Sequence, residues 1–131
     1  MKEISIRTNT RVEMIDITSA VQKALQEEKI QSGYCIVFTL HTTAAVTINE
    51  NADPDVPRDI IAALERVIPQ NASYRHSEGN SPAHVKSSLI GASELVLVEN
   101  GRIVLGTWQS VFFCEFDGPR LRKVMIKAVA G

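Results

Sequence analysis

Hydrophobic and polar residues alternate along most of this chain, and the alternation predicts a protein built mainly from β-strands. In the run 44–49, Ala44, Val46 and Ile48 fall on one face, and the residues between them are small or polar. Similar runs between turn-forming residues predict further strands at 4–6, 12–17, 34–40, 94–99, 102–105, 110–116 and 121–129. Asn100-Gly101 lies between two of these runs and indicates a hairpin.

Three segments carry the period of a helix instead. The first, 19–30, starts with Ser19-x-x-Gln22, which matches a capping box. The second, 56–68, has a proline in its first turn and Pro69 after its end. The third starts at Ser81-Pro82, the pattern of an N-cap followed by a first-turn proline, and runs to 89 or 90.

These elements predict an α+β fold in one domain, residues 1–131. Seven or eight strands joined mostly by hairpins favour an antiparallel sheet or sandwich with about three helices packed outside it. A chain of 131 residues buries about two-thirds of the surface that its unfolded form exposes, so it needs no disulfide or metal to build a core.

Composition narrows the range of partners. The formal net charge is −1, so the chain lacks the basic field that general nucleic-acid binding requires. No apolar run reaches the roughly 20 residues that span a bilayer, and no signal peptide is evident, so we expect no membrane association and a cytoplasmic location. Cys35 and Cys114 lie in apolar runs, where we expect them as small buried side chains.

The candidate chemistry centres on the three histidines. His76 lies in the longest stretch without hydrophobic period, and His84 lies in the first turn of the helix that follows. The start of this helix and Lys86 add positive charge that suits a phosphate or carboxylate. The alternative is a solvated loop with a capped helix. His41 ends a strand beside Thr42, where a ligand, a general base and a hydrogen-bonded core residue are all open.

Metal binding is a further hypothesis. His41, His76 and His84 supply enough imidazoles for a zinc site with one open position, although their spacing matches no helix-borne pair. Glu50 and Asp53 offer oxygen ligands that suit Mg²⁺, with turn formation as the alternative role.

Two other segments contain groups that could contact a ligand. Trp108 and Gln109 follow a strand and suit stacking and hydrogen bonding to a planar ring, with core filling as the alternative for the tryptophan. Asp117-Gly118-Pro119-Arg120 is typical of a tight turn, from which Arg120 could bind an anion through two hydrogen bonds.

Four segments, taken together, resemble the YjbQ family, also called UPF0047, whose members are associated with a secondary thiamine-phosphate synthase activity. They are HTTAAVTINENADPDV (41–56), YRHSEGNSPAHVKSSLIG (74–91), GTWQS (106–110) and DGPR (117–120). They span nearly the whole chain, in the same order and at matching spacing. The resemblance implies a compact β-rich α+β fold that assembles as a homotrimer, with polar sites near the subunit boundaries.

The resemblance also implies a substrate class, because the family's reaction joins hydroxymethylpyrimidine diphosphate to a thiazole phosphate and releases pyrophosphate. Charge on the leaving diphosphate must be neutralised. The residues expected to take part in catalysis are His41, Glu50, Asp53, His84 and Lys86. Those expected to bind the ligand are Thr42, Asn51, Asn80, Ser81, Trp108, Gln109 and Arg120. Zn²⁺ or Mg²⁺ is the divalent ion these side chains could hold.

Two other functions remain open from the sequence. One is a trimeric binding or scaffold protein whose weak activity is incidental. The other is a metal-dependent hydrolase of a small phosphorylated molecule, which three histidines on one zinc ion would favour.

Overall fold

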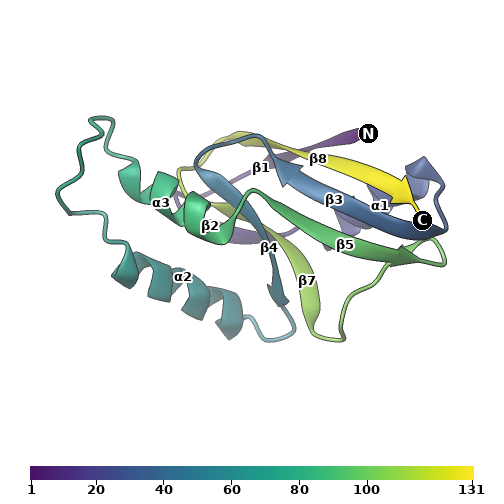
Figure 1. Cartoon of the computed structure of the whole chain (residues 1–131). Helices are drawn as coiled ribbons and strands as arrows, with labels where there is room; N and C mark the ends of the chain where they lie inside the picture. The colour runs from purple at the N-terminus through teal and green to yellow at the C-terminus, as the bar shows by residue number, and fades with distance from the viewer.

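The protein is described by a computed structural model that covers residues 1–131 (Figure 1). Eight strands and three helices follow one another along the chain. In order they are β1 (Lys2–Arg7), β2 (Glu13–Asp16), α1 (Thr18–Glu28), β3 (Ser32–Thr39), β4 (Ala44–Glu50), α2 (Asp55–Val67), α3 (Ser81–Ile90), β5 (Ser93–Glu99), β6 (Arg102–Ile103), β7 (Gln109–Glu115) and β8 (Leu121–Ala130).

All strand pairs are antiparallel, and the strands form two sheets. The larger sheet has the order β1-β8-β3-β5-β6, and the smaller has the order β2-β7-β4. The α+β prediction, with mainly antiparallel sheets and three helices, is therefore confirmed. No helix of the chain is both long enough and apolar enough to cross a membrane.

The main core lies between the two sheets and α1. Val37 and Ile126 point inward from the larger sheet, and Phe113 does so from the smaller one. Val21 and Leu25 of α1 are fully buried against them. Cys35 and Cys114 are free and buried, as their apolar surroundings predicted. Strand alternation therefore gives the inward positions of this core directly.

The start of α1 differs from the capping-box prediction. The helix begins at Thr18, and Ser19 makes no cap. Asp16 Oδ1 instead accepts the Thr18 N–H at 2.9 Å. Gln22 does not reach back to the helix start, because its amide accepts from Ile103 N–H (3.0 Å) and donates to Gly101 O (3.1 Å). A tertiary contact with β6 therefore replaces the local motif.

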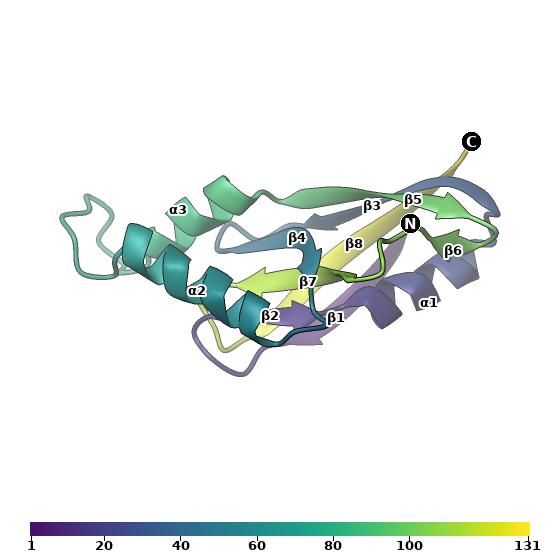
Figure 2. The ribbon, with the colours of Figure 1, turned by 90° about the horizontal axis from the view of Figure 1, so that it is seen from below.

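The other two helices lie at the opposite end of the molecule from α1 (Figure 2). α2 packs beside β2, and α3 packs beside β4. The Ser87 hydroxyl donates to Ala44 O at 2.8 Å and fixes α3 on the first residue of β4. The β3–β4 connection is thereby placed next to α3.

The larger sheet carries apolar side chains on its outer side as well as its inner side. Cross-strand register places Ile36 opposite Leu95, and Phe38 opposite Met125. These four residues and Leu97 form what we call the outer apolar face. Leu95 and Leu97 are 55% and 59% exposed, so this face is not covered within the chain.

Candidate functional site

Three connections meet at one end of the molecule and enclose a polar hollow of about 490 Å³. They are the β3–β4 connection, the turn between β7 and β8, and the segment that leads into α3. We call this space the histidine hollow, because all three histidines line it. Its lining residues are Leu40, His41, Thr42, Thr43, His76, Glu78, Asn80, His84, Asp117, Arg120 and Arg122.

The floor of the hollow is a buried ion pair between Arg122 of β8 and Glu115 of β7. Their side chains are 2% and 0% exposed. Arg122 Nε donates to Glu115 Oε1 at 2.8 Å, and Nη2 donates to Oε2. Burial alone raises the pKa of Glu115, but hydrogen bonds from Arg122, Thr8 and the Asp117 N–H outweigh it, so the pKa lies below its usual value. Glu115 is therefore ionised at neutral pH and balances the charge of the Arg122 guanidinium.

Two threonines link the Arg122–Glu115 ion pair by hydrogen bonds to the connections around the hollow. Arg122 Nη2 also donates to Thr43 Oγ1 at 2.9 Å. Thr8 donates to Glu115 Oε1 at 2.7 Å and accepts the Arg120 N–H at 2.9 Å. Gly118 fits closely here, because a Cβ on it would lie 2.4 Å from Thr10 O. The network therefore fixes the backbone that carries Arg120.

Arg120 stands at the rim of the hollow and is held by Asp117. Its Nε donates to Asp117 O at 2.9 Å, and its Nη2 lies 3.0 Å from Asp117 Oδ2. Asn80 Nδ2 donates to the same carboxylate oxygen at 2.9 Å. The N-cap residue of α3 is therefore Asn80 and not the predicted Ser81, and its side chain binds Asp117 and makes no cap. Asn80 Oδ1 is buried without a partner.

His41 is fixed by the backbone of β8. Its Nε2 accepts the Lys123 N–H at 2.9 Å. Burial, and then the positive charge of Arg122, lower its pKa, with further contributions from Arg120 and Lys123 and an opposing one from Glu115. His41 is therefore a neutral imidazole at neutral pH.

The rings of His76 and His84 lie edge to face beside each other in the lining of the hollow. Their ring centroids are 5.3 Å apart and the ring planes meet at 74°. A second, shallower hollow of about 370 Å³ lies on the far side of this pair, where Ser81 and Tyr74 are among the lining residues. The two imidazoles therefore contact both spaces.

Lys86 lies outside the histidine hollow. Its side chain is 1% exposed and pairs with Glu65 of α2, with the ammonium 5.9 Å from the Phe116 ring centroid. Arg11 binds the other oxygen of Glu65 at 3.0 Å. Burial alone raises the pKa of Glu65, but the hydrogen bonds from Lys86 and Arg11 outweigh burial, so the pKa lies below its usual value. Lys86 therefore joins α3 to α2, and its charge is used within the fold.

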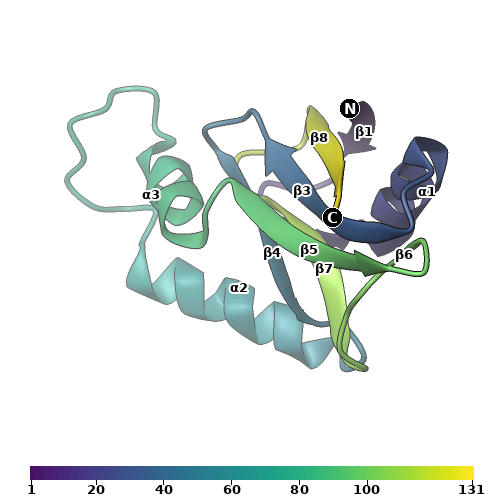
Figure 3. The ribbon, with the colours of Figure 1, turned by 45° about the vertical axis from the view of Figure 1, so that its right-hand side comes forward.

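The other five predicted residues lie at or just beyond the far end of β4: Glu50, Asn51, Asp53, Trp108 and Gln109. Figure 3 shows that this end of β4 lies away from α3. Glu50 and Gln109 are register partners there, and Asn51 N–H donates to Trp108 O at 3.1 Å. Trp108 is 63% exposed and fills no core. β4 has 7 residues, which places this end roughly 20 Å from His41 within one chain. Asp53 accepts the Asp55 N–H at 2.9 Å, as its turn-forming role requires.

The metal hypothesis can be tested on the same geometry. Nowhere in the chain do three or more His, Cys, Asp or Glu side chains lie close enough together to hold an ion. His41 Nε2 is already engaged with the Lys123 N–H. The residues present therefore do not fit a three-histidine metal centre, and we derive no step through a metal.

Sequence reasoning missed the floor of the hollow. Arg122 shares the inward side of β8 with Val124 and Ile126, and Glu115 lies within the apolar run of β7. A charge at an inward strand position requires a buried partner of opposite charge, and this is the signal that could have found the pair. Thr43 and Asp117 were within recognised motifs but were not singled out.

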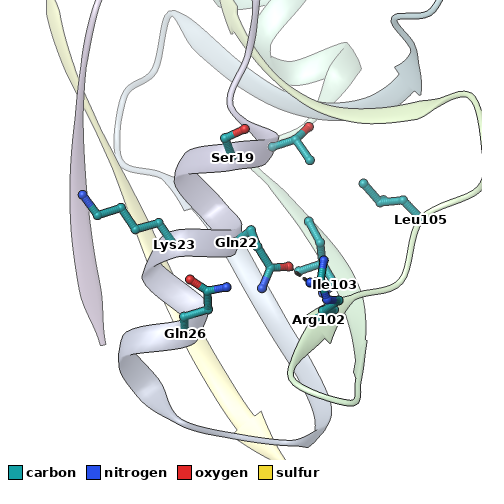
Figure 4. Close-up of a pocket in the computed structure, with 8 residues that line it drawn as sticks. Ser19, Gln22, Lys23, Gln26, Arg102, Ile103 and Leu105 are labelled. Atoms are coloured by element: carbon teal, nitrogen blue, oxygen red, sulfur yellow. Dashed lines mark hydrogen bonds between the residues drawn. The ribbon is translucent and has the colours of Figure 1, made fainter.

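Another hollow, of about 400 Å³, lies between α1 and β6 (Figure 4). Its two cations, Lys23 and Arg102, extend to different sides and do not converge. Gln22 uses both ends of its amide to hold β6. The contacts in this hollow join α1 to β6, and its charged side chains do not point toward a common ligand position.

Comparisons with known proteins identify the family of this chain. The model of the family described as UPF0047 protein YjbQ-like matches residues 2–131. The chain belongs to the UPF0047 (YjbQ-like) family. UPF0047 protein YugU of Bacillus subtilis is 54% identical over 128 residues, which cover 97% of each chain. UPF0047 protein MJ1081 of Methanocaldococcus jannaschii is 49% identical over 95% of this chain and 90% of its own.

Solved structures agree with this membership. A YjbQ/UPF0047 family protein from Clostridium acetobutylicum is 51% identical and superposes with a TM-score of 0.96, covering 98% of this chain and all of its own. A protein of unknown function from Sulfolobus solfataricus has a TM-score of 0.94 at 30% identity, covering 99% of this chain and 96% of its own. The UPF0047 fold of this chain is therefore shared by distant relatives.

Proposed function

We propose that the histidine hollow binds the diphosphate of a small molecule, and that this UPF0047 protein transfers hydroxymethylpyrimidine from its diphosphate to a thiazole phosphate. The observation that carries the proposal is the convergence of two guanidinium groups and three imidazoles on one polar space. The Nε and Nη2 groups of both arginines bind Asp117 or Glu115, whereas their Nη1 groups have no partner in the chain and can donate to a phosphate.

The charges around the hollow support a role for the histidines. Glu115 offsets Arg122, and Asp117 offsets Arg120, so the arginines alone leave little net positive charge. Imidazole is the side chain that changes charge in the physiological pH range. The imidazoles of His76 and His84 add further hydrogen-bond donors for the diphosphate oxygens.

The proposed reaction uses these groups on the leaving diphosphate. The bond between the pyrimidine methylene carbon and the diphosphate oxygen breaks, and its electron pair leaves with the oxygen. The thiazole nitrogen then donates its lone pair to the methylene carbon. Arg120 and Arg122 stabilise the developing negative charge, and a protonated His84 donates a proton to the departing diphosphate.

Two variants test the proposal, with turnover and pyrophosphate affinity as the measurements. His84→Ala is expected to lower turnover by about 100-fold, within the range of a lost general acid. Arg120→Ala is expected to weaken pyrophosphate binding by about tenfold, since the loss of a charged hydrogen bond costs about 1.5 kcal/mol.

Arg102→Ala is the matched control for Arg120→Ala, because it removes another exposed arginine from a different part of the surface. It should leave both measurements unchanged. Wild-type turnover in His84→Ala, or equal effects of the two arginine substitutions on affinity, would contradict the proposal.

We also propose that the chain assembles as a homotrimer through the outer apolar face. Leu95, Leu97 and Phe38 are exposed on this face, and burying such a surface between copies is favourable. Sedimentation equilibrium of the purified chain measures the assembly directly. A trimer is the expected result, and a monomer at all concentrations would contradict it.

A further inference from the structure

We infer that His41 is held as the neutral Nδ1–H tautomer and offers this N–H to the oxygen of a bound anion, as a fixed hydrogen-bond donor and not as a proton carrier. The inference rests on the proposed function for the identity of the anion. It assigns different roles to the three histidines of the hollow.

The ring of His41 is bound to the backbone of β8. The Lys123 backbone N–H can only donate, and it points at His41 Nε2 from 2.9 Å. Nε2 must therefore carry a lone pair and no proton. In a neutral imidazole the proton then resides on Nδ1.

The Nδ1–H of His41 is not used within the chain. Nδ1 has no hydrogen-bond partner in the chain, yet it is not among the buried unpartnered polar atoms, which are Glu28 Oε1 and Asn80 Oδ1. His41 lines the histidine hollow. The free N–H is therefore open to a ligand in that space.

Three cations near His41 disfavour its protonated form. The groups that act on His41 are Arg122, Arg120 and Lys123, which disfavour the imidazolium, and Glu115, which favours it. His76, His84, Glu78 and Asp117 face it from the other connections around the hollow. Protonation at Nε2 would also bring two donors together, because the Lys123 N–H occupies that position. His41 therefore serves as a poor base, whereas His76 and His84 have no such backbone contact.

Long-range ¹H–¹⁵N correlation spectra of the histidine side chains test the tautomer without any ligand. Between about pH 6.5 and 8, His41 is expected to give the Nδ1–H pattern throughout. A dominant Nε2–H or imidazolium pattern at pH 7 would overturn the inference.

Two variants of similar shape test the role of the donor, with pyrophosphate as the probe. His41→Asn places an amide N–H close to the position of Nδ1–H and is expected to retain affinity within about threefold, whereas His41→Leu should lose about tenfold. Thermal denaturation of both variants separates this effect from a loss of folding. Equal affinities in the two folded variants would overturn the donor role.

The outcomes distinguish this inference from the proposed function. If wild-type protein fails to bind pyrophosphate, the proposed function is contradicted, and so is the role of His41 as donor to that anion. If the protein binds pyrophosphate but His41 lacks the Nδ1–H pattern, this inference alone fails.

Discussion

Replacing Glu115 with glutamine is expected to lower the free energy of unfolding by about 3–5 kcal/mol, because it leaves the Arg122 guanidinium buried without a counter-charge. Arg122 is 1% exposed, and Glu115 is fully buried. Thermal denaturation should show a fall in melting temperature of roughly 10–20 °C. Glu99→Gln, at the exposed end of β5, is the control and should change the melting temperature by only a degree or two.

The pH dependence of this effect has a defined sign. The folded pKa of Glu115 lies below its usual value of 4.5, so its stabilisation is present above that value and is lost as the pH falls through the folded pKa. The stability difference between wild type and Glu115→Gln should therefore be full at pH 7 and shrink in strong acid. A difference that stays constant down to pH 2, or no difference at pH 7, would contradict the buried ion pair.

Lys86→Met is expected to lower stability by about 1–3 kcal/mol while leaving turnover at 25 °C close to that of wild type. Methionine keeps the apolar stem but removes the ammonium that binds Glu65. Arg11 remains on this carboxylate, which limits the loss. Denaturation curves and turnover on the same preparation measure the two quantities.

Lys23→Met, on the exposed side of α1, is the matched control and should alter neither quantity. If Lys86→Met abolished turnover while the protein remained folded and stable, Lys86 would have a direct role in catalysis. That result would contradict its assignment as a link between α3 and α2.

The fold could be predicted because its signals are local. Alternation gave the inward faces of strands such as β4, and the Asn100-Gly101 pair gave the β5–β6 hairpin. The errors occur where tertiary contacts compete with local motifs. Gln22 binds β6 in place of capping α1, and the position before α3 belongs to Asn80, which binds Asp117, and not to the predicted Ser81.

The candidate site was predictable only in part. The segments that carry His41, His76, His84 and Arg120 were all recognised, but segment order cannot tell which ends of the strands meet. Glu50 shares a segment with His41, and Trp108 belongs to another of the four segments, yet both lie at the other end of β4. Likewise, the charge of Lys86 was expected to bind a ligand, and only the packing of α3 on α2 reveals its partner.

A titration of ¹⁵N-labelled protein with pyrophosphate shows whether an anionic ligand binds in the histidine hollow. Backbone and side-chain resonances report where the anion binds along the chain. Binding in the hollow is expected to give the largest shifts at Thr42, Asn80 and Arg120, with an unchanged indole signal from Trp108. Saturable shifts centred on Trp108 and Gln109, or no shifts at millimolar pyrophosphate, would contradict it.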